Sequence, residues 1–225
     1  NFLAFKNKNN LFLIEDNSHG FGGLYKNKNL GTFGDIGFSS PRKSLPILNG
    51  GILYSQSNSE IKNFNNLENF SILALTLGAL IKRDKLSLFK NTESVSAPFC
   101  IDFTSYKYIK GLNLDFVRNK RSKIYNLWTR WSKENNLTPL YKLNTSLYCP
   151  LYFPIVTKNF ESHSYLKKLF KNENIAFTIW PNLPNNLPKI STAHKLRDSI
   201  ICLPIHIGMN LKCLKKRLSK IKISN

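Results

Sequence analysis

The chain has 225 residues, which is long enough to bury a hydrophobic core in one domain with a smaller second one. Its content of 42% hydrophobic and 12% aromatic residues excludes an intrinsically disordered protein. The formal net charge of +20 suits a polyanion or an anionic substrate, but the basic residues are scattered except in residues 212–222. We therefore favour a compositional bias, rich in Lys, Asn and Ile as in AT-rich genomes, over nucleic-acid binding.

Cysteine spacing and the apolar runs indicate a reduced, cytoplasmic protein without a membrane span. The sequence opens NFLAFKNKNN, with no methionine and no signal-peptide pattern. The longest apolar run, residues 70–81, is too short to cross a bilayer and predicts a buried helix. The cysteines show no C-x-x-C spacing and no paired histidines, which argues against a metal site. They are Cys100, Cys149, Cys202 and Cys213.

Three short apolar runs near the start of the chain predict strands of a mostly parallel sheet. They are residues 11–14, 35–38 and 51–54, and each borders a polar or glycine-rich turn. Because the carboxyl ends of parallel strands meet at the ligand-binding edge of a sheet, the polar residues beside these runs are candidate site residues.

Polar side chains follow the first two runs directly. Asp16 and His19 come after the first run, and the second run leads into Ser39, Ser40 and Lys43. A strand-end aspartate suits a cationic, partly buried partner. A lysine becomes a nucleophile when burial or a neighbouring cation lowers its pKa, and the arginine that precedes Lys43 could be such a cation. Pyridoxal phosphate (PLP) needs such a lysine and such an acid, and the two serines with the nearby glycines can hold its phosphate.

Each of these residues also has a simpler interpretation when it is taken alone. Lys43 fits a solvated loop charge, Asp16 fits a turn or a helix cap, and His19 fits a ring that is hydrogen-bonded to its own loop. Their occurrence together, in this order and at this spacing, favours a site.

The order and spacing resemble those of the DegT/DnrJ/StrS-type aminotransferases, PLP enzymes of fold type I that aminate sugar nucleotides. The resemblance rests on IEDNSH at residues 14–19, GTFGDIGFSS at 31–40, PRKSLP at 41–46 and GG at 50–51. It implies that Lys43 is the Schiff-base lysine, that Asp16 pairs with the pyridine nitrogen and that His19 lies beside the phenolic oxygen. It implies that Ser39 or Ser40 binds the phosphate, and a serine-to-lysine spacing one residue shorter than in many members leaves that choice open.

The resemblance also implies that part of the cofactor site lies outside this sequence. The lysine of the family lies near the middle of its chain, whereas here it is residue 43, and the Asn-Tyr-Arg-like motif that reaches the partner subunit's cofactor is not visible at residues 69–77. We therefore expect the C-terminal portion of a longer enzyme. The expected fold class is α/β, a PLP-dependent transferase of fold type I. Its parts are the rear of the large domain in residues 1–112, a connecting helix in 113–136 and a small α+β domain in 137–225.

Hydrophobic periodicity sets the expected elements of the middle of the chain. Residues 58–90 predict a helix, residues 91–111 a connector and residues 115–135 an amphipathic helix. Basic residues interleaved with aromatic ones would also suit a helix that binds nucleic acid, but one core face and one solvated face is favoured. The apolar positions of this helix are Phe116, Val117, Ile124, Leu127, Trp128 and Trp131.

From residue 137 onward, alternating strand and helix patterns predict an α+β layer. Trp180 and His206 lie at strand ends and are candidates for the border of the substrate pocket, although a packing tryptophan and a turn histidine are equally compatible with the sequence. The expected strands are residues 148–157, 175–180 and 200–205, and the expected helices are residues 161–172, 192–197 and 210–223.

The function expected from the residues and the resemblance together is PLP-dependent amino transfer, in which Lys43 moves a proton between two carbons. By the resemblance, glutamate donates the amino group, a nucleotide-linked keto-sugar or similar ketone accepts it, and the enzyme is a homodimer. A lysine rather than a histidine at this position argues against the members that dehydrate sugars. The alternative, which rests on the charge of +20, is a catalytically decayed fold that serves as a basic module and holds RNA or another polyanion.

Overall fold

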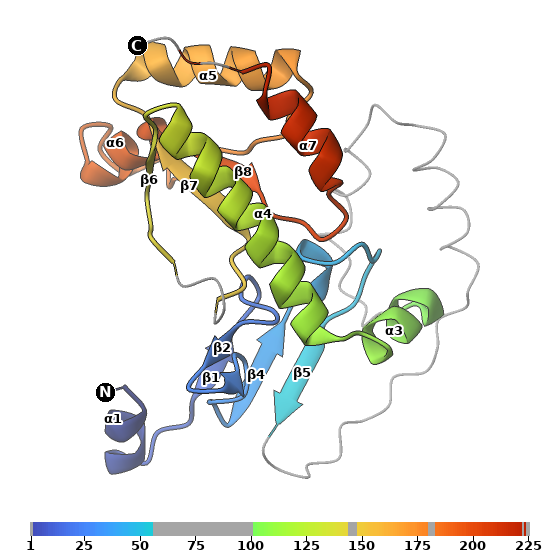
Figure 1. The fold of residues 1–225 in the computed structure, drawn as a ribbon. Helices are drawn as coiled ribbons and strands as arrows, with labels where there is room; N and C mark the ends of the chain where they lie inside the picture. Colours follow the sequence, from blue (N-terminus) through green and yellow to red (C-terminus); the bar gives the residue numbers. More distant parts are fainter. Residues whose placement is uncertain (1, 56–100, 144–147, 180–182, 222, 224–225) are drawn as a thin grey trace.

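The computed structural model describes residues 2–55, 101–143, 148–179, 183–221 and 223. Two three-stranded sheets, one from each half of the chain, lie at opposite ends of a long helix, α4 (Figure 1). The helix predicted at residues 58–90 lies outside the described residues. None of the helices in the described ranges is long and apolar enough to span a membrane.

The first sheet has the strand order β1-β4-β5 and carries the candidate site at one edge. β1 (Ile14–Asp16) and β4 (Ile36–Ser39) are parallel, as the sequence predicts, with Asp16 opposite Phe38. β5 (Ile52–Ser55) is antiparallel to β4. Of the three predicted strands, β1 and β4 therefore end at the same edge of the sheet, whereas β5 begins there. The connection from β4 turns back at the edge where β4 ends, and a parallel return would need a longer crossover.

Two elements of this half are absent from the sequence-based predictions. Helix α1 (Phe2–Lys8) precedes β1, and a hairpin of β2 (Leu24–Tyr25) and β3 (Lys28–Asn29) follows it. The two hairpin turn residues, Lys26 and Asn27, both have positive φ, of 47° and 61°. Such a two-residue turn matches the right-handed twist of paired strands.

The glycine motif of residues 31–37, which leads into β4, packs two segments of backbone against each other. Gly31 has a φ of +96°, and a Cβ atom on Gly37 would overlap the carbonyl oxygen of Gly31. The carboxylate of Glu15 holds this turn, because it accepts hydrogen bonds from the N–H groups of Gly31 at 2.6 Å and Phe33 at 2.8 Å. The motif therefore fixes the position of β4 against the turn that crosses it.

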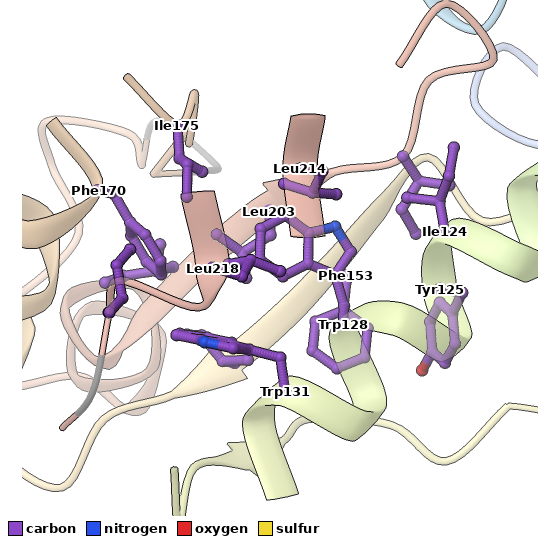
Figure 2. Packing of buried hydrophobic residues seen from close by; sticks show 14 of the residues in the cluster. Ile124, Tyr125, Trp128, Trp131, Phe153, Phe170, Ile175, Leu203, Leu214 and Leu218 are labelled. Atoms are coloured by element: carbon purple, nitrogen blue, oxygen red, sulfur yellow. The ribbon is translucent and has the colours of Figure 1, made fainter. Parts of the chain in front are cut away.

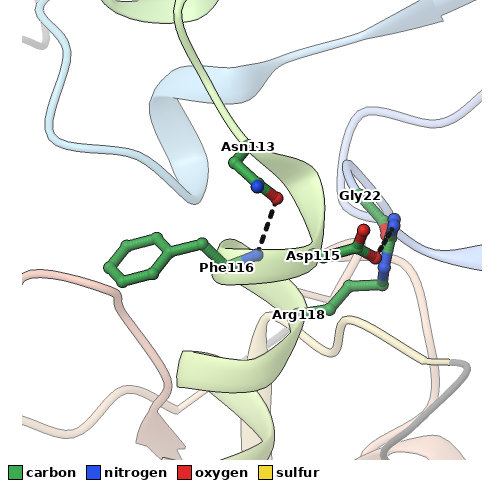
Figure 3. A network of polar contacts seen from close by, with 5 residues as sticks. All are labelled: Gly22, Asn113, Asp115, Phe116 and Arg118. Atoms are coloured by element: carbon green, nitrogen blue, oxygen red, sulfur yellow. Dashed lines mark hydrogen bonds and ion pairs between the residues drawn. The ribbon is translucent and has the colours of Figure 1, made fainter.

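Helix α4 (Leu114–Glu134) coincides with the predicted helix to within one residue at each end. The side chain of Asn113 caps its N-terminus by accepting a hydrogen bond from the N–H of Phe116 at 3.1 Å (Figure 3). Its apolar face is buried as predicted, except that Leu127 is half-buried and Phe116 is exposed. α3 (Phe103–Lys110), which Asp102 caps, occupies most of the described part of the predicted connector.

The second sheet, with the strand order β6-β7-β8, is antiparallel throughout. Its strands are β6 (Thr138–Pro139), β7 (Tyr152–Val156) and β8 (Ile200–Pro204), and its helices are α5 (Phe160–Asn172), α6 (Thr192–Ser199) and α7 (Leu211–Leu218). The strand predicted at residues 175–180 is not formed over its described part, where Thr178 makes a single bridge to Cys202. β7 pairs with β8 on one side and with β6 on the other.

The main core lies between α4, the second sheet and helices α5 and α7 (Figure 2). Trp128 is fully buried at its centre, and its indole Nε1–H donates to the carbonyl of Pro204 at 3.0 Å. The rings of Trp128 and Trp131 meet edge to face with centroids 5.8 Å apart. Because aromatic side chains bury the most apolar area, this cluster anchors α4 on the second sheet.

A smaller core joins the two halves of the chain. Its buried members come from the first half, from α4 and from the segments around β7 and β8; they are Phe21, Leu45, Val117, Cys149 and Ile207. Arg118 adds a polar link, because its guanidinium donates to the carbonyl of Gly22 at 3.0 Å and pairs with Asp115 at 2.6 Å (Figure 3). The first turns of α4 thus hold the loop that follows His19.

Candidate active site

The structure brings the predicted lysine and histidine into contact. Lys43 is the last residue of the short 3-10 helix η1 (Pro41–Lys43), and its Nζ atom lies 3.0 Å from Nε2 of His19. An ammonium group offers only donors, so Nε2 of His19 must accept, which places the imidazole proton on Nδ1. Burial and then the charge of Lys43 lower the pKa of His19 below its ordinary 6.5. His19 is therefore neutral at neutral pH and accepts from the lysine.

Asp16 lies close enough to this pair for their charges to act on it. Its Oδ1 atom accepts a hydrogen bond from the N–H of Ser18 at 2.9 Å. The hydroxyl and the N–H of Ser18 lower the pKa of the Asp16 carboxyl below 3.8, and the charges of Lys43 and His19 lower it further. Asp16 is exposed and stays an anion throughout the neutral range.

The two serines after β4 differ in their surroundings. Ser39 is buried, and its hydroxyl accepts a hydrogen bond from the amide of Asn17 at 2.9 Å. The same amide donates to the carbonyl of Leu30 at 2.9 Å. Ser40 is half-buried at the N-cap of η1, and its side chain does not cap that helix. Asn17, which the sequence-based site does not include, therefore ties the end of β1 to the end of β4.

Asp35 lies in the same motif but has a structural role. Its carboxylate pairs with Lys6 of α1 at 2.8 Å and accepts from the N–H of Leu13 at 2.7 Å. Those two bonds attach α1 and the entry to β1 to the turn before β4. Asp35 acts on the position of β1 and not on the lysine directly.

The structure does not place both predicted pocket-border residues at Lys43. Trp180 lies outside the described residues. His206 lies just after β8, is half-buried, and its Nδ1 atom accepts a hydrogen bond from the N–H of Gly208 at 3.0 Å. No group of three or more His, Cys, Asp or Glu side chains in the described part of the chain is arranged to hold a metal ion.

A sequence model of a known family matches the segment that holds the site. The sequence model of the DegT/DnrJ/EryC1/StrS aminotransferase family matches residues 2–80. This match confirms the resemblance that the motifs around Asp16 and Lys43 indicate. No match is found among curated protein sequences.

Solved structures of low sequence identity share the fold over nearly the whole chain. An aminotransferase of this family from Brucella abortus has a TM-score of 0.59 at 19% identity and covers 97% of this chain and 58% of its own. Helicobacter pylori PseC, an aminotransferase involved in the biosynthesis of pseudoaminic acid, has the same TM-score and identity over 96% of this chain and 60% of its own. E. coli GDP-4-keto-6-deoxy-D-mannose-3-dehydratase with bound hydrated PLP has a TM-score of 0.58 at 13% identity, over 98% of this chain and 63% of its own.

These likenesses confirm the predicted fold class, a partial large domain of fold type I with a small α+β domain. The chain spans about three fifths of the length of the solved structures that it matches.

Proposed function

We propose that this chain, whose residues 2–80 match the model of the DegT/DnrJ/EryC1/StrS aminotransferase family, forms the lysine-bearing part of a PLP-dependent aminotransferase. The observation that carries the proposal is the convergence of an amine, an imidazole and a carboxylate where β1 and β4 end. The Nζ atom of Lys43 lies 3.0 Å from His19, and the charge of Lys43 acts on Asp16.

The residues present fit the chemical groups of PLP. Lys43 offers the amine that binds the aldehyde, and Asp16 offers an anion for the protonated pyridine nitrogen. For the phosphate we favour Ser40, because the hydroxyl of Ser39 is already bonded to Asn17 in a buried position. Bound there, the cofactor supplies an electron sink that stabilises negative charge on the substrate carbon.

Lys43 is placed to act as the base in amino transfer, and His19 is placed to orient it. Lys43 must lose its ammonium proton before it acts as a base, and the neutral His19 ring, 3.0 Å from Nζ, is placed to orient that amine through a hydrogen bond. With the cofactor bound, Lys43 would be the base that removes a proton from the substrate carbon bearing the amine and later returns a proton. The position of His19 beside the phenolic oxygen stays a prediction.

The substrates that we propose are glutamate as the amino donor and a nucleotide-linked keto-sugar or similar ketone as the acceptor. The support is the family match and the description of the Helicobacter pylori enzyme, whose pathway makes pseudoaminic acid. A net charge of +20 is compatible with an anionic acceptor such as a sugar nucleotide. The comparisons do not favour the alternative of a basic RNA-binding module.

We further propose that the full-length protein is a homodimer and that the 225-residue chain alone binds PLP weakly. The chain spans 58% of the Brucella abortus structure that it matches. This chain would contribute Asp16, from the end of β1, and Lys43, from the helical turn after β4, to the cofactor site.

Spectroscopic titration with PLP tests the proposal. The full-length protein should develop a visible absorbance band that Lys43→Ala abolishes, whereas Lys28→Ala, in the exposed strand β3, should leave it unchanged. A band of equal strength in the Lys43→Ala variant would refute the role of this lysine.

The two serines give a second, finer test. Ser40→Ala should weaken PLP binding without loss of folding stability, since its hydroxyl caps no helix. Ser39→Ala should instead reduce stability by about 1 kcal/mol through the lost Asn17 bond. The reverse pattern would assign the phosphate to Ser39.

A further inference from the structure

We propose that Asn17 is a positioning residue, whose side-chain amide and backbone together hold His19 beside Lys43. The proposal deepens the proposed function, because it rests on Lys43 as the reactive lysine. It gives a role to the residue that follows Asp16 at the end of β1. Asn17 acts through the two backbone segments that carry the histidine and the lysine, and its hydrogen bonds go to those segments and to the turn between them.

The side-chain amide of Asn17 joins the end of β4 to the segment that precedes the glycine motif. Its Nδ2 atom donates to the carbonyl of Leu30 at 2.9 Å and to the hydroxyl of Ser39 at 2.9 Å. A carbonyl oxygen only accepts, so the atom that faces Leu30 is the amide nitrogen, and both of its protons are used. Asn17 is 5% exposed and Ser39 is 3% exposed. Because a buried amide that loses its partners is destabilising, the side chain stays where it makes both bonds.

The backbone of Asn17 fixes the turn that carries His19. Its N–H donates to the carbonyl of Phe38 at 2.9 Å, which continues the pairing of β1 with β4 beyond the last strand residue. Its carbonyl accepts from the N–H of Gly20 at 3.2 Å, which closes the turn of residues 17–20. His19 lies inside this turn, so its position relative to β4 is set at Asn17.

Lys43 is connected to the same point by a short path. Ser39, which accepts from the Asn17 amide, is the last residue of β4. The next residue, Ser40, accepts at its carbonyl from the N–H of Lys43 at 3.1 Å, so a single hydrogen-bonded turn leads from the strand end to the lysine. The distance of 3.0 Å between Nζ of Lys43 and Nε2 of His19 therefore depends on two turns that both start from Asn17.

Gly20 leaves the space that the amide of Asn17 occupies. A Cβ atom on Gly20 would overlap Oδ1 of Asn17 and would lie 3.3 Å from Cδ1 of Leu30. The amide cannot move aside freely, because both of its donor bonds hold it. Gly20→Ala is therefore a second way to displace the amide, and it leaves the atoms of Asn17 unchanged.

A double-mutant cycle followed by NMR measures the contact that Asn17 is proposed to hold. In the full-length protein without PLP, the pKa of the His19 imidazole is compared with and without Lys43→Ala, first in the wild type and then in Asn17→Ala. An ammonium group 3.0 Å from the ring lowers the imidazole pKa, and this effect falls at least in proportion to distance. Once the two turns are released, the change in pKa that Lys43→Ala produces should fall to less than about half of its wild-type size.

Two further variants separate positioning from a general loss of stability. Gly20→Ala should reduce the change in the pKa of His19 as Asn17→Ala does, because it displaces the same amide. Trp128→Phe, in the main core, should leave that change at its wild-type size although it destabilises the protein. A purely structural role of Asn17 would lower the unfolding midpoint and leave the coupling between His19 and Lys43 intact.

The proposal is overturned if folded Asn17→Ala retains the wild-type change in the pKa of His19, and circular dichroism shows whether the variant is folded. It is also overturned if Lys43→Ala leaves the pKa of His19 unchanged in the wild-type background. A loss of coupling in Trp128→Phe equal to that in Asn17→Ala would overturn it as well, because the coupling would then follow stability and not the amide.

Variants that fold poorly leave the test decidable. If Asn17→Ala does not fold, Gly20→Ala decides, and if neither folds, Ser39→Ala decides, because it removes one of the two bonds of the amide. Full wild-type coupling in the deciding variant would overturn the proposal. PLP is absent from these measurements, and reductive labelling of Lys43 with PLP is scored separately. Failure of the proposed function and failure of this proposal are therefore distinguishable.

Discussion

Gly37→Ala tests the physical reason for the glycine motif before β4. A Cβ atom at this position would overlap the carbonyl oxygen of Gly31 and lie 3.1 Å from its Cα atom. The obstacle is backbone and not the end of a flexible side chain, so the turn itself must move. Because β4 leads into the segment that carries Lys43, the substitution should also disturb the site.

The expected loss in free energy of unfolding follows from the hydrogen bonds that hold the turn at Gly31 in place. Displacing Gly31 stretches the two hydrogen bonds that the Glu15 carboxylate accepts, from Gly31 at 2.6 Å and Phe33 at 2.8 Å. Hydrogen bonds to a charged acceptor contribute about 1.5 kcal/mol or more each, so the loss in free energy of unfolding should be about 3 kcal/mol. Overpacking strain of a similar size is typical of rigid interiors, at about 1 to 3 kcal/mol.

Urea denaturation followed by circular dichroism measures this loss, with Gly51→Ala as the matched control. A Cβ atom on Gly51 would meet only the carbonyl of Ser39, at an ordinary 3.5 Å. The control should therefore change the free energy of unfolding by less than about 1 kcal/mol. Equal midpoints for the two variants would refute the claim that close approach, and not glycine flexibility in general, explains the motif.

Other predictions address the core, the imidazole and the charge. Trp128→Phe should destabilise the protein by about 2 kcal/mol, because the Pro204 carbonyl loses its donor. Phe116→Ala, on the exposed face of α4, should have little effect. Equal losses of stability for the two variants in thermal denaturation would contradict the described packing. His19 should titrate below pH 6.5 by NMR and closer to 6.5 in Lys43→Ala, since burial and then the lysine charge lower its pKa, and a value above 6.5 in the wild type would exclude the contact. Retention on immobilised RNA should depend on salt no more steeply than retention on a sulfate resin, and a markedly steeper slope would revive the basic-module alternative.

The site segment could be predicted from sequence because its constraints are local. The strand ends at Asp16 and Ser39, the glycines between them and the lysine that follows lie within about thirty residues and in the order in which the fold uses them. The helix around Trp128 was equally clear, because its apolar positions repeat with helical spacing over many turns.

Features that depend on pairing between distant segments could not be predicted from local sequence patterns. Residues 175–179 have the apolar and β-branched composition of a strand, yet they make only the single bridge of Thr178 to Cys202 of β8. The third strand of the sheet is instead the short Thr138–Pro139, which pairs with β7. The reversed direction of β5 is set by the turn after Lys43, and nothing in its own sequence states a direction.

The most direct test of the central claim is to find which lysine binds PLP. The full-length protein and the 225-residue chain are each incubated with PLP and reduced with borohydride, and the modified residue is mapped by mass spectrometry. We expect labelling at Lys43 in the full-length protein and little or none in the shorter chain. Labelling of the full-length protein at any other lysine, with Lys43 unmodified, would contradict it.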